Sequence, residues 1–336
     1  MIRNLVLCYP VQESHLEKIR KSAGGMNVID AGQEGIAEAI FNADVYCGHA
    51  KVPIDWEEVV RRKRLRWIQS SAAGMDHCLV PPVIESDIIV TSASGVLSDQ
   101  VAEHTLGLII GFWRSFPTFF RQQQQHDFVR RPTRELTRST VGIVGLGGVG
   151  RRLVELLRPF HVRILATDMF PIDKPEGVDE LWGPDKLDKM LPEVDTLILA
   201  APLNESTEGM IGSEQITRMK SNALLVNAAR GPLVVTDELV DALESGYLAG
   251  VVMDVTDPEP LPKDHPLWDM PNVTITPHVA GQYRWRIDNM TRLLCENLRR
   301  YYAGLPLINR LEQKSLGFPI RGGKYPLWCD LDETVE

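Results

Sequence analysis

The sequence predicts an α/β protein of two domains with parallel sheets, and three observations lead to that prediction. The chain has 336 residues, more than one hydrophobic core usually serves. Two series of short apolar segments alternate with amphipathic ones, one over residues 1–99 and one from residue 140 onward. Such alternation is typical of strands joined by crossover helices. A glycine-rich loop opens the second series.

The composition excludes several classes of partner. Hydrophobic residues make up 44% and charged residues 24% of the chain, and 36 Lys and Arg stand against 45 Asp and Glu for a net charge of -9. Nucleic acids and anionic membranes require a basic face, so we expect no nucleic-acid and no membrane partner. No apolar run reaches the roughly 18 residues of a membrane helix. An anionic small substrate would have to be held by local arginines.

The cysteines and histidines indicate a reducing setting without a metal. Five cysteines are widely spread and form no C-x-x-C pair, and the apolar run of the N-terminus is too short for a signal peptide. These features predict a cytoplasmic protein. The histidines show no metal-ligand spacing, so no metal is expected.

The first series has strand-like segments at 4–9, 43–48, 66–71 and 87–92, with helical patterns near 12–22 and 55–64. A long helix is then predicted over 98–116, because Ser98 can cap it and apolar residues recur at helical spacing.

The second series has six strand-like segments, which is the number that a dinucleotide-binding fold requires. They lie at 141–145, 162–168, 195–201, 223–229, 249–255 and 272–278. A last amphipathic helix is predicted over 287–304.

The stretch VGIVGLGGVGRRLVELL carries G-x-G-x-x-G directly after a strand and at the start of a helix. Here Gly145 permits a tight turn, Gly147 lets a pyrophosphate approach the backbone, and Gly150 lets helix and strand pack closely. The phosphates would rest on free N–H groups at the helix N-terminus. The predicted contacts are Gly145, Leu146, Gly147, Gly148, Val149 and Gly150.

The next strand ends in Asp168, 18 residues beyond Gly150 by number. A carboxylate there accepts hydrogen bonds from the adenosine ribose and repels a 2′-phosphate, so NAD is favoured over NADP. No arginine follows at 169 or 170 to receive that phosphate.

The stretch LLVNAARGPLV places Arg230 at the mouth of a buried strand and follows it with Gly-Pro. In an open α/β sheet, ligands bind at the carboxyl ends of the strands. Arg230 could clamp a planar carboxylate there with its fork of donors. The strand ends expected near the nicotinamide are those of Pro202, Ala228, Arg230, Asp254 and His278.

His278 follows the last strand in TPHVAG, and the loop MDVTDPEPLP supplies carboxylates for it. A carboxylate on one ring nitrogen fixes the tautomer, so the other nitrogen can carry a proton near neutrality. That arrangement suits protonation of an oxygen as hydride arrives at its carbon. Spacing alone leaves Asp257 and Glu259 as alternative partners.

In this order GLGGVG, a strand-end Asp, NAARG, MDVTDPEPLP and TPH resemble the D-isomer-specific 2-hydroxyacid dehydrogenases, especially the glyoxylate and hydroxypyruvate reductase branch. The resemblance covers about residues 90–310, and DQVAEHTLGLI fits the family's interdomain helix. It implies that Arg230, Glu259 and His278 are catalytic, with Glu259 preferred over Asp257. It also implies a nicotinamide contact at Asp254.

The resemblance implies an architecture and a substrate loop as well. Two flavodoxin- or Rossmann-like domains would flank a cleft, with a discontinuous substrate-binding domain at 1–99 and 288–336 and an NAD-binding domain at 100–287. Backbone N–H groups of Ala73 and Gly74 would share the substrate carboxylate with Arg230. A homodimer through the helices near 98–130 is also implied.

The expected function is therefore hydride transfer between NAD(H) and a small 2-keto or 2-hydroxy acid of the D series. One departure bears on the substrate: Tyr283, Arg284 and Trp285 stand where the family has small residues. Formate dehydrogenase shares the fold, but that branch has Gln in place of Glu259. A non-enzymatic NAD(H)-sensing scaffold like the corepressors of this family is the alternative from another class. A methyltransferase would not explain Arg230, Glu259 and His278 together.

Overall fold

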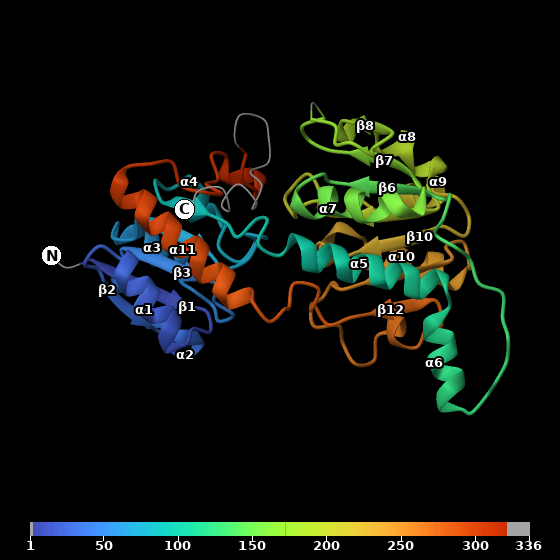
Figure 1. Cartoon of the computed structure of the whole chain (residues 1–336), viewed down its shortest axis with the longest axis horizontal. Coiled ribbons are helices and arrows are strands. Elements are labelled where there is room, and N and C mark those ends of the chain that lie inside the picture. Colours follow the sequence, from blue (N-terminus) through green and yellow to red (C-terminus); the bar gives the residue numbers. More distant parts are fainter. Residues whose placement is uncertain (1–2, 172, 321–336) are drawn as a thin grey trace. The chain divides into compact units, whose positions relative to one another are not determined.

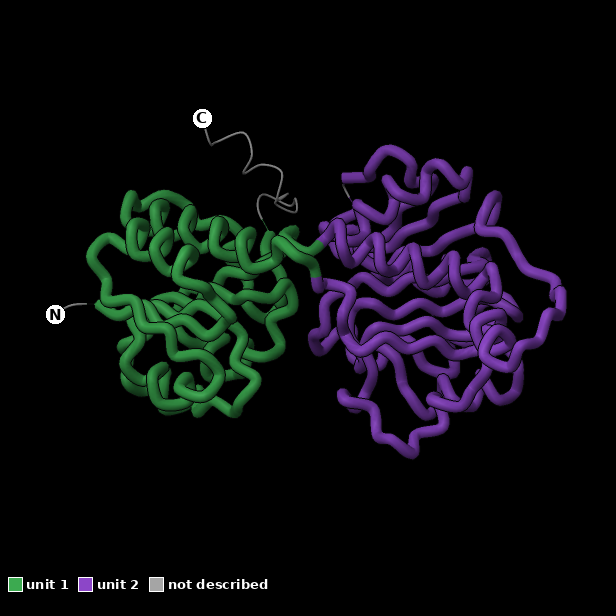
Figure 2. The backbone as a smooth tube through the Cα atoms, turned by 60° about the horizontal axis from the view of Figure 1, so that its bottom comes forward, with its two compact units in different colours: residues 1–97, 283–336 green, residues 98–282 purple. Residues whose placement is uncertain are grey.

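The computed structural model describes residues 3–171 and 173–320, and the chain divides into two compact units. Unit 1 combines residues 1–97 with 283–336, and unit 2 is the continuous segment 98–282 (Figure 2). The sequence predicts boundaries near 99 and 288, whereas the contacts place them at 97/98 and 282/283. The outer unit's role in binding substrate stays a prediction. Residues 321–336, the end of that predicted domain, lie outside the described residues.

Unit 1 is a five-stranded parallel sheet in the order β2-β1-β3-β4-β5 (Figure 1). Its strands are β1 (Asn4–Cys8), β2 (Asn27–Asp30), β3 (Val45–Gly48), β4 (Trp67–Ser70) and β5 (Ile89–Thr91). Its helices are α1 (Glu13–Ser22), α2 (Gly32–Ala39), α3 (Trp56–Arg61), α4 (Pro81–Glu85) and α11 (Arg286–Ala303).

Alternate residues of the β1 strand enter opposite cores, as the two-residue period of a strand requires. Leu5 and Leu7 pack with α1 and with α11, whereas Val6 lies in the core formed with α2, α3 and α4. The last long helix therefore completes the sheet that the first strand began.

Unit 2 is a seven-stranded parallel sheet in the order β12-β11-β10-β9-β6-β7-β8. Its strands are β6 (Thr140–Val144), β7 (Arg163–Thr167), β8 (Glu180–Trp182), β9 (Thr196–Leu199), β10 (Leu224–Asn227), β11 (Gly250–Met253) and β12 (Val273–Ile275). Its helices are α5 (Ser98–Trp113), α6 (Phe116–Gln124), α7 (Gly148–Leu157), α8 (Leu187–Met190), α9 (Ser213–Arg218) and α10 (Thr236–Glu244). The order reverses between β6 and β9, which is the switch point where doubly wound sheets bind ligands.

Both faces of this sheet are covered by helices. Leu224 and Val226 of β10 pack toward α5 and α7, while Leu225 between them packs toward α8, α9 and α10. The α/β prediction of two parallel sheets is confirmed.

The structure also contains features that the sequence pattern did not predict. Strands β2 and β8 lie at sheet edges, where few residues are buried, so neither has a long apolar run. The predicted helix 98–116 ends at Trp113, because Ser115 adopts a left-handed backbone with φ 58°. A separate helix, α6, begins one residue later.

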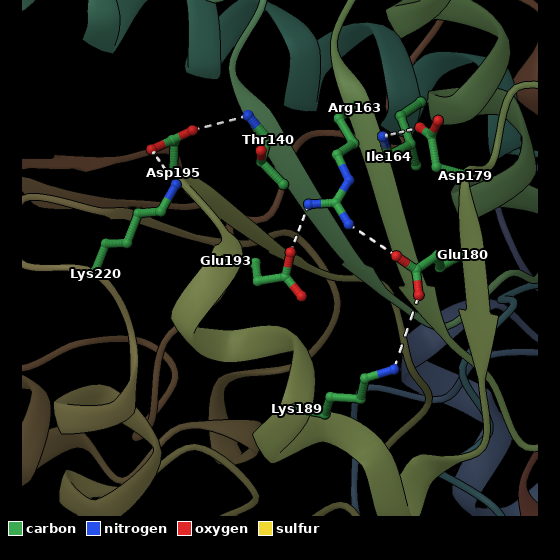
Figure 3. A network of polar contacts seen from close by, with 9 residues as sticks. All are labelled: Thr140, Arg163, Ile164, Asp179, Glu180, Lys189, Glu193, Asp195 and Lys220. Carbon is green, nitrogen blue, oxygen red and sulfur yellow. Dashed lines mark hydrogen bonds and ion pairs between the residues drawn. The ribbon is translucent and has the colours of Figure 1, made fainter.

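Ion pairs and hydrogen bonds connect the amino ends of β6, β7, β8 and β9 in unit 2 (Figure 3). Asp195 accepts a hydrogen bond from the N–H of Thr140 at 2.8 Å and contacts Lys220 at 2.9 Å. Arg163 donates to Glu193 at 2.5 Å and to Glu180 at 2.8 Å. These residues begin or precede strands, so this network lies at the sheet edge opposite to the carboxyl ends.

No helix within residues 3–171 and 173–320 is long and apolar enough to span a bilayer.

Candidate active site

The carboxyl edge of the unit 2 sheet gathers most of the predicted site residues. All strands run parallel, and Val144 of β6 is in register with Thr167 of β7 and Leu199 of β9. The segments that follow these strands therefore leave the sheet at one edge. In strand order they carry the glycine loop, Asp168, Pro202, Ala228 with Arg230, Asp254 and His278.

The glycine loop has the geometry that its motif requires. Gly145 has φ 97°, a backbone conformation that residues other than glycine rarely adopt. A Cβ atom on Gly150 would lie 2.1 Å from the carbonyl oxygen of Gly145, so only glycine permits this approach of helix α7 to strand β6. A Cβ atom on Gly147 would meet nothing within 4 Å, so the loop has open space on the side where a phosphate could approach.

Asp168 ends β7 with a fixed carboxylate. It accepts hydrogen bonds from the N–H of Leu146 at 2.7 Å and from the N–H of Phe170 at 2.8 Å, and it is buried. The carboxylate thus joins the glycine loop to the end of the next strand. This arrangement holds a negative charge beside the turn that is expected to receive the dinucleotide.

Arg230 is placed by a turn that Asn227 builds. The side chain of Asn227 accepts from the N–H of Ala229 at 3.1 Å and donates to the carbonyl of Arg230 at 2.8 Å. A Cβ atom on Gly231 would lie 2.0 Å from the carbonyl oxygen of Thr256, so the residue after Arg230 must be glycine for the chain to pass the segment that follows β11. The Arg230 guanidinium donates to the carbonyl of Ala229 at 2.7 Å and is half-buried.

His278 and Glu259 contact one another. Nδ1 of His278 lies 2.7 Å from Oε1 of Glu259, and the two side chains are 48% and 44% exposed. Two cis prolyl peptide bonds shape the chain around Glu259. One joins Asp257 to Pro258, and the other joins Glu259 to Pro260. Asp257, the other candidate partner, uses its backbone carbonyl to accept from the Thr236 hydroxyl at 2.9 Å. The imidazole therefore has its carboxylate partner on Nδ1, which leaves Nε2 for proton exchange.

Asp254 is engaged by the segment that carries His278. Its carboxylate is 2% exposed and accepts from the hydroxyl of Thr276 and from the N–H groups of Val279 and Ala280. A nicotinamide contact at Asp254, implied by the resemblance, would have to share this carboxylate with three donors of the protein.

In unit 1, Ala73 and Gly74 follow strand β4 at the carboxyl end of its sheet. The Ser70 hydroxyl accepts from the N–H of Ala72 at 3.0 Å and also meets the ring of His77 at 3.4 Å. The His77 ring stacks on that of His49, with centroids 4.0 Å apart. The loop is therefore held by its own polar side chains.

The segment after the last strand, with Tyr283, Arg284 and Trp285, is where the chain returns to unit 1. The hydroxyl of Tyr283 donates to the carbonyl of Val96 at 3.2 Å and accepts from Asn289 at 2.8 Å. The guanidinium of Arg284 lies over the exposed Trp285 ring at 4.1 Å. Tyr283 therefore joins the two points at which the chain leaves and re-enters unit 1.

Comparison with known proteins decides the family. Residues 106–280 match the model of the NAD binding domain of D-isomer specific 2-hydroxyacid dehydrogenases. The chain belongs to this family. A glyoxylate reductase from Thermofilum pendens is 36% identical over 253 residues, which cover 73% of this chain and 74% of that protein. The mitochondrial formate dehydrogenase 2 of Oryza sativa subsp. japonica is 34% identical over 257 residues, covering 74% and 67%.

A solved structure of the same family has the same fold over nearly the whole chain. It is a D-isomer specific 2-hydroxyacid dehydrogenase from Xanthobacter autotrophicus Py2, in complex with NADPH and MES. The TM-score is 0.79 at 26% identity, and the alignment covers 94% of this chain and all of that one. The 2-hydroxyacid dehydrogenase family therefore accounts for both units of the chain.

Two residues near His278 were missed by reasoning from the sequence. Thr276 bonds to Asp254, and His104 on helix α5 bonds to Thr276 at 2.9 Å. A polar His104 amid the apolar spacing of α5 was the available signal, but the pattern does not say which strand end it meets.

Proposed function

We propose that the protein is an NAD-dependent reductase of small 2-keto acids that yields the D-2-hydroxy acid. The observation that carries this proposal is the 2.7 Å contact between His278 Nδ1 and Glu259 at the same sheet edge as Arg230. An acid and base pair beside a guanidinium suits reduction of a carbonyl next to a carboxylate. The shared family supports the reaction class.

The chain's residues divide the chemistry in the following way. Arg230 binds the substrate carboxylate and polarises the keto oxygen, and the Ala73 and Gly74 amides bind the same carboxylate. Glu259 keeps the proton on Nδ1 of His278, so Nε2 delivers a proton to the keto oxygen and takes one back in the reverse direction. NADH, when bound, supplies the hydride for C2.

The preference for NAD is also a proposal. The glycine loop with Gly145, Gly147 and Gly150 fits a dinucleotide, and the fixed carboxylate of Asp168 fits ribose hydroxyls and repels a 2′-phosphate. The related structure from Xanthobacter autotrophicus holds NADPH. Met169 and Phe170 follow Asp168 in this chain, so no arginine stands directly after it to receive such a phosphate.

The first test is NADH oxidation followed by absorbance with glyoxylate, hydroxypyruvate, pyruvate, 2-ketoisocaproate and phenylpyruvate, with NADPH as the control cofactor. Turnover of one keto acid with NADH that is lost in His278→Ala supports the proposal. Formate oxidation with NAD, and no keto acid reduction, would instead show the activity named for the rice relative. Tight NADH binding without any turnover would contradict the proposal and favour the sensing scaffold.

We also propose a homodimer through α6 and the residues after it. Phe120 is 59% and Phe128 95% exposed, and the neighbouring Phe116 and Val129 are exposed as well. Several large apolar side chains exposed within one short segment are typical of a surface that another protein chain covers. Light scattering on the native chain should give twice the 37.7 kDa monomer mass. Phe120→Glu should shift it to the monomer, and a monomeric native chain would contradict the proposal.

A cytoplasmic location stays a prediction. The four described cysteines, Cys8, Cys47, Cys78 and Cys295, are free thiols, which is usual in a reducing compartment. Cys329 lies outside the described residues.

A further inference from the structure

We propose that His104 is a positioning residue for His278, acting through the hydroxyl of Thr276 and the carboxylate of Asp254. This inference rests on the proposed function, because it assigns His278 the proton transfer. His104 lies on helix α5, and the other three residues lie at the ends of β11 and β12. All four residues belong to unit 2.

The backbone of His278 needs support. Its φ is 53°, in the left-handed region that residues other than glycine adopt at a cost. The N–H of His278 donates to the carbonyl of Asp254 at 2.8 Å and to that of Thr276 at 3.0 Å. A strained residue at a strand end keeps one conformation only when its surroundings hold it, and Asp254 and Thr276 provide the first part of that hold.

The carboxylate of Asp254 provides the second part. Oδ1 accepts from the Thr276 hydroxyl at 2.6 Å and from the N–H of Val279 at 3.0 Å, and Oδ2 accepts from the N–H of Ala280 at 2.9 Å. The donors stand on both sides of His278 in the chain. A buried carboxylate requires such donors. Asp254 therefore holds the residues before and after His278 by hydrogen bonds to the same carboxylate.

The direction of the hydrogen bonds extends this network to His104. The two carboxylate oxygens of Asp254 each accept an amide N–H, which can only donate, so the single hydroxyl proton of Thr276 also goes to Asp254. The Thr276 oxygen is then an acceptor for His104 Nε2, 2.9 Å away. His104 Nε2 therefore carries a hydrogen, and it lies 3.6 Å from Asp254 Oδ1.

Helix α5 gives His104 a fixed base. Ala102, Thr105 and Ile109 of the same helix are buried, and α5 packs along α7, the helix that the glycine loop opens (Figure 1). The chain of contacts from His104 to Thr276 and Asp254 thus couples the turn of His278 to the helix layer behind the dinucleotide loop.

Matched pairs of variants test the network in the full-length enzyme. His104→Leu and Thr276→Val remove the donor and the hydroxyl, whereas His104→Gln and Thr276→Ser keep an N–H donor and a hydroxyl. We expect kcat to fall about 10- to 100-fold in the first pair, because small misplacements of a catalytic group have effects of that size. In the first pair, KM for NADH should change little and the solvent isotope effect on kcat should rise. The second pair should retain most of kcat. Thr217→Val, at an exposed position of α9, is the control.

A double variant and a spectrum complete the test. If His104 acts through Thr276, the double variant His104→Leu with Thr276→Val loses no more than the larger single loss, whereas a product of both losses overturns the proposal. Equal loss in Thr276→Ser also overturns it. If the native enzyme reduces no keto acid, the proposed function fails, and the network is read from the imidazole nitrogen NMR signal of His278, assigned with His278→Asn. The chemical shift of that signal should change in His104→Leu and Thr276→Val only. An unchanged chemical shift in all four single variants overturns the proposal.

Discussion

Arg230 owes its place to its neighbours in the chain. Asn227 turns the backbone after β10, and Gly231 lets the chain pass within contact of Thr256. A guanidinium can offer two parallel donors to a carboxylate, which a lysine ammonium cannot do, and this is the role that we propose for Arg230. The position of Arg230 therefore depends on the glycine that follows it.

We expect Arg230→Ala to lower kcat/KM for the preferred keto acid by about 100- to 1,000-fold, as loss of a charge-assisted contact in the transition state does. Arg230→Lys should recover only part of that loss. Initial rates against keto acid concentration give the comparison, with Arg218→Ala on the exposed face of α9 as control. An unchanged kcat/KM in Arg230→Ala would refute the assignment.

Asp168 allows a second residue-level prediction. Asp168→Ser removes the charge beside the expected ribose, so the ratio of kcat/KM with NADPH to that with NADH should rise about tenfold or more, by the loss of repulsion from a 2′-phosphate. Steady-state rates with both cofactors measure the ratio. Asp173→Ser, which removes the partner of Arg151, should leave it nearly unchanged. A ratio unchanged in both variants would contradict the role of Asp168.

At the scale of elements, the sequence predicted those with strong periodicity. Buried strands such as β6 and β10 have continuous apolar runs, and α7 and α11 have one apolar face, so their patterns stand out. The edge strands β2 and β8 bury few residues and left no such run. The site residues at strand ends followed from the rule for parallel sheets. The link from His104 to Thr276 did not, because 172 positions separate the two residues and no local pattern encodes a contact across that distance.

Asn297 of helix α11 has a buried side-chain amide that connects the helix to the rest of unit 1. Asn297 donates to Gln69 of β4 at 2.8 Å and to the carbonyl of Ile308, and it accepts from the N–H of Ile308 at 2.7 Å. Asn297→Ala should lower the free energy of unfolding of unit 1 by about 2–4 kcal/mol, because buried polar groups would lose their partners. Denaturant unfolding followed by circular dichroism gives the value. Arg299→Ala, on the exposed face of the same helix, should unfold at the native midpoint, and an equal loss in both would contradict the role of Asn297.

At the scale of the whole molecule, unit 2 is a continuous segment with both of its cores inside itself. We expect a fragment of residues 98–282 to fold cooperatively and to bind NADH. A fragment of residues 1–97 should stay unfolded, because one of its cores needs Met290, Leu293, Leu294 and Leu298 of α11. Thermal melts and NADH fluorescence measure both outcomes. A cooperative melt of the 1–97 fragment would show that its sheet does not depend on α11.

The discontinuity of unit 1 has a consequence for the order of synthesis. Edge strand β5 is bridged by Arg310, and Leu311 donates to the carbonyl of Val90 at 2.9 Å. A ribosome makes these partners more than 200 residues after β5, so residues 1–97 of unit 1 wait while all of unit 2 emerges. Unit 2 is thus the part that can fold on the nascent chain. The face of β1 and β3 that α11 completes, with Leu5, Leu7, Val45 and Cys47, lacks that helix through the interval and would be the natural target of a chaperone.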